Sequence, residues 1–375
     1  MAPNSKLNAK RKAQREGAKP AKPRSDRRPT NDAKAPATQY IPIELQQLLL
    51  NIFRNSFAER LSSDFGPLLQ EVKGHLYNRD FAIAFGKNEY LEAYAARWSP
   101  SRALGYLELL WELREELWSE EEQEDENQDQ KEENTKSKSR KVVCLGGGAG
   151  AEIVALGGLQ KMISSMSSEE EGSEIEGQHV EVAAIDVADW SVVVENLAQQ
   201  LTIAPALNKY ASAAAKAANV PLLNPEDITI QFKQQDVLQA TASELSAQLA
   251  DANLVTLLFT LNELYSTSMP LTQKFLLLLT SILQSGALLL VVDSPGSYSS
   301  VTLNGAEKKY PMQWLLDHTL LKQASGNLNE RGKEEIVRWE KVKEDDSRWF
   351  RLDERLRYPI ELENMRMQVH LYRKL

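Results

Sequence analysis

A short apolar run that ends in clustered glycines constrains the fold of this chain more than any other feature. The stretch runs from Lys141 to Glu152 and reads KVVCLGGGAGAE. This order of residues predicts a buried strand, a tight turn and the start of a helix. Glycine lets the backbone approach a ligand closely, and the N–H groups of a helix N-terminus bind negative charge. The stretch therefore predicts a nucleotide-binding turn, with a plain turn that holds no ligand as the alternative.

Two cofactor motifs fit these glycines equally well. Gly146, Gly148 and Ala151 satisfy the dinucleotide pattern G-x-G-x-x-G/A. Gly146, Gly148 and Gly150 satisfy the G-x-G-x-G pattern of S-adenosylmethionine enzymes. The turn by itself leaves both cofactors open.

Four further apolar runs end in polar residues. Strands are expected at residues 179–186, 227–232, 254–260 and 287–292. The polar residues at or just beyond their ends are Asp186, Asp236, Asn262 and Asp293. In an open parallel sheet, ligands bind beyond the carboxyl ends of the strands. The glycine turn and these four ends are therefore expected to converge on one site.

Asp186 has two possible roles at the end of the second strand. An acid in this position usually accepts hydrogen bonds from ribose hydroxyls. Its distance from the glycines exceeds the usual spacing, and the acidic insert at residues 164–178 accounts for the excess. Alternatively, Asp186 or Asp189 caps a helix that starts at Trp190. Ribose binding is the preferred interpretation.

Charge divides the chain into segments. Residues 1–39 form a basic tail in which positions 1 to 34 hold 11 Lys or Arg and three acids, although the net charge of the chain is −9. Such a tail is predicted to be disordered. It is interpreted as a nuclear or nucleolar address that also contacts RNA phosphate, with a cytoplasmic pool still compatible; a solubilising leader is the alternative. Residues 119–139 are predicted to be an acidic linker between a helical domain (40–118) and the main domain (140–375).

The helical domain contains one unusual cluster. A helix is expected to stop at Ser99-Pro100 and to restart at Ser101. Arg97, Trp98 and Arg102 flank this break, where they could meet a phosphate, a cofactor carboxylate or a base, or pack in the core.

Composition excludes several classes of protein. No apolar run approaches the ~20 residues that a membrane-spanning helix needs. The one cysteine, Cys144, forms no internal disulfide, and the four histidines lack the spacing of metal ligands. We therefore expect no membrane segment and no metal, and nothing in the sequence demands an oligomer.

The C-terminal region changes character. Residues 307–321 are expected to be helical, and residues 335–342 and 365–371 alternate as antiparallel strands do. A dinucleotide dehydrogenase would instead repeat its parallel unit. The prediction is an α/β, Rossmann-like fold with a mostly parallel sheet and antiparallel C-terminal strands, preceded by a small helical region.

Six segments of the chain resemble the fungal 25S ribosomal RNA uridine-N3 methyltransferases. They read YAARWSPSRAL (94–104), VCLGGGAGAE (143–152), FTLNELYS (259–266), LVVDSPGSYS (290–299), YPMQWLL (310–316) and YPIELEN (358–364). The likeness covers roughly residues 40 to 375 outside the acidic inserts. It implies a class I methyltransferase fold and transfer of a methyl group from S-adenosylmethionine to N3 of a uridine in large-subunit ribosomal RNA, either free or in a preribosomal particle.

The resemblance also implies roles for residues in the cofactor site. Gly146, Gly148 and Gly150 would lie against the methionine part, and Asp186 would hold the ribose. Asp236 and Val237 would border the adenine. Glu152, which closes the glycine motif, is assigned to the same site.

On the substrate side, Asn262 occupies the place where many base methyltransferases carry Asn or Asp before a Pro and an aromatic residue. Here the sequence is Asn262-Glu263-Leu264-Tyr265, so a copied base-binding role does not follow directly. The candidates for catalysis are Asn262, Glu263 and Asp293. The candidates for RNA contact are Arg97, Trp98, Arg102, Tyr265 and Tyr298; Trp314 is expected to belong to the core.

Two other functions stay open at this point. A nicotinamide-dependent oxidoreductase shares the glycine turn. A non-catalytic ribosome-assembly factor could retain the methyltransferase fold.

Overall fold

The computed structural model describes most of the chain from residue 41 onward. The described ranges are 41–62, 65–118, 139–167, 179–205, 219–296, 298–303, 306–325 and 337–375, with isolated residues between 207 and 216. The basic tail and nearly all of the two acidic stretches lie outside them. Within these ranges, no helix has the length and apolar character needed to cross a membrane.

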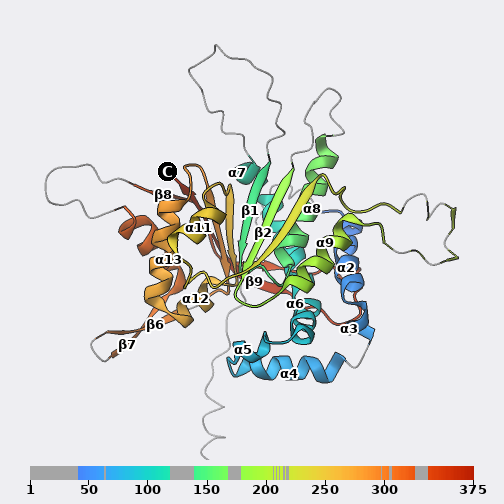
Figure 1. Cartoon of the computed structure of the whole chain (residues 1–375), viewed down its shortest axis with the longest axis horizontal. Coiled ribbons are helices and arrows are strands. Elements are labelled where there is room, and N and C mark those ends of the chain that lie inside the picture. Colours follow the sequence, from blue (N-terminus) through green and yellow to red (C-terminus); the bar gives the residue numbers. More distant parts are fainter. Residues whose placement is uncertain are drawn as a thin grey trace, which may run out of the picture. The chain divides into compact units, whose positions relative to one another are not determined.

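One seven-stranded sheet organises the molecule (Figure 1). Its strands lie in the order β3 (Ile228–Gln234), β2 (Val180–Asp186), β1 (Arg140–Leu145), β4 (Leu254–Leu258), β5 (Leu288–Asp293), β9 (Met365–Lys374) and β8 (Trp339–Phe350). The first five are parallel, whereas β9 runs antiparallel to both β5 and β8. The predicted α/β class, with antiparallel strands at the C-terminus, is confirmed. A separate hairpin pairs β6 (Tyr298–Leu303) with β7 (Ala306–Pro311).

Helices cover both faces of the sheet (Figure 1). On one face lie α2 (Ile43–Ser56), α6 (Asn88–Glu112), α8 (Ala151–Ser167) and α9 (Ser191–Thr202). On the other lie α11 (Ala242–Leu249), α12 (Leu261–Thr267), α13 (Met269–Ile282), α14 (Met312–Asp317) and a π-helix at His318–Gln323. The short helices α3 (Ala58–Ser62), α4 (Phe65–Tyr77), α5 (Phe81–Ala84) and α7 (Arg114–Trp118) complete the N-terminal region.

The two-residue period of the strands divides the core into two halves. In β1, Val142 and Cys144 pack in one cluster, whereas Val143 and Leu145 pack in the other. Successive side chains of a strand point to opposite faces of the sheet, so a strand covered on both sides must be apolar throughout. This explains why β1, β4 and β5 read as continuous apolar runs.

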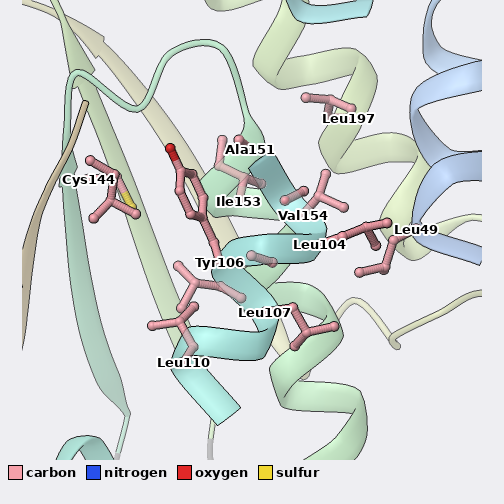
Figure 2. Packing of buried hydrophobic residues seen from close by; sticks show 14 of the residues in the cluster. Leu49, Leu104, Tyr106, Leu107, Leu110, Cys144, Ala151, Ile153, Val154 and Leu197 are labelled. Carbon is pink, nitrogen blue, oxygen red and sulfur yellow. The ribbon is translucent and has the colours of Figure 1, made fainter. Parts of the chain in front are cut away.

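The N-terminal helices share their core with the sheet. Leu104 and Leu107 of α6 pack with Ile153 and Val154 of α8, and Leu49 of α2 joins them (Figure 2). Residues 41 to 375 accordingly form one compact unit. The helical segment that was predicted as a separate domain is thus part of the layer that covers one face of the sheet.

The predicted helix break at Ser99-Pro100 is wrong. Helix α6 runs without interruption through Pro100. Proline has no N–H to donate to the carbonyl four residues earlier, which is that of Ala96. The hydroxyl of Tyr358 donates to this carbonyl instead, at 2.9 Å. A tertiary contact from the C-terminal part of the chain therefore satisfies the acceptor that Pro100 leaves open.

One other boundary differs from expectation. Residues 306–311 form strand β7, so the predicted helix over 307–321 starts only at Met312. The difference lies at the end of an element, where the neighbouring chain decides how far the element extends.

Candidate functional site

The strand order brings the predicted polar ends to one edge of the sheet. Strand β1 lies between β2 and β4, and the helix that follows β1 covers the opposite face from the helices that follow β4. This reversal creates a crevice at the carboxyl ends of β1 and β4, where ligands bind in folds of this kind. The glycine turn stands at that point, between Asp186 on one side and Asn262 on the other.

The glycine turn has no room for side chains. Gly146 and Gly150 have φ angles of +76° and +80°, which favour glycine. A Cβ atom on Gly146 would lie 2.3 Å from Oγ1 of Thr260, and one on Gly148 would lie 2.2 Å from Cδ1 of Trp190. The sequence therefore needs glycine here to form the turn at all, in addition to any ligand contact.

Asp186 is tied to the glycine turn. Its carboxylate accepts hydrogen bonds from the N–H groups of Gly148 and Ala188, each at 3.2 Å. Burial raises the pKa of this carboxyl group, and the two N–H donors oppose that shift. The alternative role is filled by Asp189, which accepts from the N–H of Ser191 at the start of α9, also at 3.2 Å. Asp186 is thus available at the edge of the crevice, as the ribose interpretation requires.

Asp236 and Val237 lie beside Asp186. Strand β3 pairs with β2 so that Gln234 is opposite Asp186, and the N–H of Gln235 donates to the Asp186 carbonyl at 2.7 Å. Asp236 is exposed and Val237 is 9% exposed. The position predicted for the adenine end of the cofactor therefore adjoins the position predicted for its ribose.

Glu152 lies beneath the turn. It is 4% exposed and accepts a hydrogen bond from the Thr256 hydroxyl of β4. Burial raises the pKa of Glu152 to about 8, so the carboxyl group is mostly protonated at neutral pH. The hydrogen bond between Glu152 and Thr256 links α8 to β4 below the glycines. This indicates that Glu152 supports the turn.

The three candidates for catalysis meet where β4 and β5 end. The Asp293 carboxylate accepts from the N–H groups of Asn262 (3.0 Å) and Ser294 (2.8 Å), so it holds the start of α12. Oδ1 of Asn262 and Oε2 of Glu263 are buried, and no described residue hydrogen-bonds to them. Buried polar atoms without partners are rare in native proteins and indicate a missing ligand or water. These two atoms are consistent with a polar substrate edge in the crevice.

Glu263 is also coupled to a distant part of the chain. Burial raises its pKa, and the positive charge of Arg79 lowers it in part. Arg79 lies at the corner between α4 and α5, with a φ angle of +60°. Phe85, which follows α5, packs against Trp190, with ring centroids 5.6 Å apart. The segment from Arg79 to Phe85 therefore borders the crevice, which the sequence alone did not indicate.

The candidates for RNA contact are not gathered on one surface. Arg97 is 6% exposed and forms an ion pair with Glu363, and Trp98 packs against Tyr94 with ring centroids 4.7 Å apart. Tyr265 is 3% exposed and belongs to the core beneath α12. Burial leaves Tyr265 no exposed ring face for a base. Tyr298 begins β6, but its side chain lies outside what the structure describes.

Trp314 departs from the expectation of a core residue. It is 47% exposed, and its ring stacks between Tyr310 and His318 at centroid distances of 5.1 and 5.2 Å. Only its neighbours Leu315 and Leu316 belong to the core.

Sequence reasoning missed several residues that shape the site. Thr260 and Trp190 pack against the glycines, the charge of Arg79 lowers the pKa of Glu263, and Phe259 takes a φ angle of +58° directly after β4. Such a φ angle is uncommon for a bulky residue, and strained backbone is often found at functional sites. Nothing in the sequence around Phe259 indicates this conformation.

The arrangement fits the cofactor that the resemblance implies. The glycine turn stands at the crevice with the N–H of Gly148 bonded to the Asp186 carboxylate, and Asn262 and Glu263 at the end of β4 carry buried acceptors without partners among the described residues. Within the described ranges, no three His, Cys, Asp or Glu side chains are grouped as metal ligands would be.

Comparison with known proteins gives consistent results. A family model of SAM-dependent methyltransferases matches residues 53–373. The 25S rRNA (uridine(2843)-N(3))-methyltransferase of Saccharomyces cerevisiae is 33% identical over 344 residues, which cover 88% of this chain and 85% of the yeast protein.

Solved structures show a more distant likeness. A SAM-dependent methyltransferase from Methanosarcina mazei is 10% identical, covers 64% of this chain and 93% of its own, and has a TM-score of 0.33. The N-methyltransferase NodS from Bradyrhizobium japonicum, in complex with S-adenosyl-l-homocysteine, is 11% identical, covers 63% of this chain and 78% of its own, and has a TM-score of 0.28.

Proposed function

Since the chain belongs to the family of S-adenosylmethionine-dependent methyltransferases, we propose that it methylates N3 of a uridine in large-subunit ribosomal RNA. The cofactor follows from the family. The base and the RNA follow from the yeast relative, whose name specifies both. One structural observation carries the proposal. At the end of β4, Asn262 and Glu263 carry buried acceptors without partners among the described residues, and the neighbouring strand β1 ends in a glycine turn that is hydrogen-bonded to Asp186. An oxidoreductase is not supported, because the family match is to methyltransferases.

The chain's own residues would hold the cofactor along the carboxyl edge of the sheet. Gly146, Gly148 and Gly150 would bring the backbone close to its methionine part, Asp186 would accept from the ribose hydroxyls, and the segment at Asp236 would border the adenine. When bound, the cofactor supplies an electrophilic methyl group on a sulfonium. The protein therefore mainly has to align the acceptor nitrogen with that methyl group and exclude water.

Methylation of uridine N3 also requires the loss of its imide proton. Glu263 fits a proton acceptor better than Asp293 does. Both oxygens of Asp293 accept from backbone N–H groups, whereas Oε2 of Glu263 has no partner among the described residues. A carboxylate with a pKa raised toward the working pH is a more effective base. Asn262 would hydrogen-bond to the uracil edge, and its amide can both donate and accept.

A covalent route through cysteine does not fit this site. Cys144 is fully buried within β1, and burial raises the pKa of its thiol. A thiol that stays protonated and cannot reach the crevice is no nucleophile. Direct transfer to a ring nitrogen is consistent with this arrangement.

The target base would have to leave its stack to reach the crevice. The basic tail at residues 1–39 would attract RNA phosphate, because the rest of the chain is acidic. The same tail would direct the protein to the nucleus or nucleolus.

Transfer of labelled methyl groups to large-subunit RNA tests the function. Nucleoside mass spectrometry of the product should show 3-methyluridine, and the Asp186→Ala variant should lose the label together with cofactor binding. Label in another nucleoside would contradict the uridine-N3 assignment. Tight cofactor binding without transfer to RNA or preribosomal particles would favour a non-catalytic assembly factor.

A further inference from the structure

The guanidinium of Arg102 has an unusual environment for a charge inside a protein. Its Nη1 donates to the Tyr94 hydroxyl at 2.9 Å. The guanidinium carbon lies 5.1 Å from the ring centroid of Phe259 and 5.7 Å from that of Tyr94. All three contacts are with neutral groups. Among the described residues, no carboxylate forms an ion pair with Arg102, although buried charges are normally paired.

Two other largely buried arginines do have acidic partners. Arg97 pairs with Glu363, and Arg348 pairs with Glu112 at 2.9 Å. The two acids in electrostatic range of Arg102 are committed elsewhere. Asp293 binds the N–H groups of Asn262 and Ser294, and Glu152 has a pKa of about 8 and is mostly neutral. No acidic side chain among the described residues therefore forms an ion pair with Arg102.

The position of Arg102 indicates which anion would match it. Helix α6 is fastened to the glycine turn by the Ser99 hydroxyl, which donates to the Ala149 carbonyl at 2.7 Å. Phe259, under the guanidinium, follows β4 directly, and the next residue, Thr260, packs on Gly146. Arg102 thus stands where the glycine turn meets the end of β4. Arg102 has intermediate exposure, so part of it remains accessible.

We infer that Arg102, oriented by Tyr94, binds the carboxylate of the cofactor's methionine part. This inference rests on the proposed function, since it assumes S-adenosylmethionine in the crevice. A guanidinium forms two parallel hydrogen bonds with a carboxylate, and the flanking aromatic rings exclude water and strengthen the contact. It replaces the expectation that Arg102 contacts RNA.

Calorimetry with two ligands tests the assignment on the full chain. S-adenosylmethionine and its decarboxylated form differ in the carboxylate alone. The wild-type protein should bind the carboxylated ligand about 10- to 100-fold more tightly, because hydrogen bonds to a charged group contribute about 1.5–3 kcal/mol. Arg102→Gln should remove this preference by weakening only the carboxylated ligand. Its affinity for decarboxylated S-adenosylmethionine should stay within about twofold.

Conservative variants keep the test decisive if Arg102→Gln does not fold. Arg102→Lys retains the charge and should keep part of the preference, and Tyr94→Phe should reduce it by releasing the guanidinium. Arg114→Gln, on a helix that precedes the acidic linker, is the matched control and should change neither affinity.

Two outcomes separate this inference from the proposed function. A wild-type protein that binds both ligands equally, or an Arg102→Gln variant that loses both equally, would overturn the role of Arg102 and leave the methyltransferase assignment intact. A wild-type protein that binds neither ligand would overturn the function itself. Weaker RNA binding by Arg102→Gln with unchanged cofactor affinity would restore the RNA role.

Discussion

At the scale of single residues, Glu263 connects the structure to the chemistry. Burial raises its pKa, and it acts as a base only when deprotonated. The kcat/KM of methyl transfer should therefore fall as the pH decreases through this raised pKa. Glu263→Gln should lower kcat by about 10²- to 10⁴-fold and remove the acidic limb of the pH profile. An acidic limb that persists in this variant would exclude Glu263 as the base.

Two related variants sharpen this prediction. Arg79→Gln removes a positive charge that favours the carboxylate, so the acidic limb should move to higher pH. Asp293→Asn should weaken the start of α12 and lower the thermal midpoint while the limb stays in place, because Asp293 binds backbone N–H groups there.

The raised pKa of Glu152 leads to a prediction about stability rather than activity. Its pKa is about 8 in the folded protein, above the ordinary 4.5 expected for the unfolded chain. The folded state then binds more protons between these two values, so the free energy of unfolding should decrease as the pH rises through this window. The total loss is on the order of a few kcal/mol. Urea titrations of wild type and Glu152→Gln at about pH 6 and about pH 8.5 should show the loss in the wild type only; equal losses would contradict it.

At the scale of elements, helix α6 depends on a contact from far along the sequence. The Tyr358 hydroxyl satisfies the Ala96 carbonyl that Pro100 leaves open. Tyr358→Phe should therefore destabilise the protein by about 1–2 kcal/mol, because a buried acceptor loses its partner. Pro100→Ala restores a backbone donor to the same carbonyl, so it should reduce the cost of Tyr358→Phe. A double-mutant cycle measured by urea unfolding checks this coupling; strictly additive effects would contradict it.

The position of α6 also matters for the site. The same helix carries Ser99, which holds the glycine turn, and Arg102, which lies over the ring of Phe259 directly after β4. A helix continuous through Pro100 keeps these residues in one rigid element. Tyr358→Phe should consequently weaken cofactor binding slightly in addition to lowering stability.

At the scale of the whole molecule, opposite charges are separated along the chain. The tail is basic, whereas the rest of the chain is acidic enough to give a net charge of −9. Deleting residues 1–39 should weaken binding to large-subunit RNA and make the dependence of log Kd on log salt concentration shallower, because fewer counterions are released. Cofactor affinity should not change. An unaltered salt dependence would show that other residues provide the phosphate contacts.

The sequence by itself determined the parts of this protein that depend on local chemistry. Apolar runs predicted the strands, clustered glycines predicted the turn, and polar residues at strand ends predicted where a ligand binds, since all parallel strands end at the same edge. The family also followed from local motifs. Each of these features depends on residues that are close together in the sequence, so it can be recognised without knowing what packs against it.

Only the tertiary structure decided the rest, because it depends on contacts between distant residues. Tyr358 keeps α6 continuous across a proline, and Phe259 accepts an unusual φ angle directly after β4. Packing buries Arg97 and Tyr265, and it leaves Arg102 with the Tyr94 hydroxyl as its hydrogen-bond acceptor, which is the basis of its proposed cofactor role. The local residue pattern determines where polar groups occur. The packing of remote segments determines which of them form a hydrogen bond or ion pair within the chain, and a group without such a partner is the one left to bind a ligand.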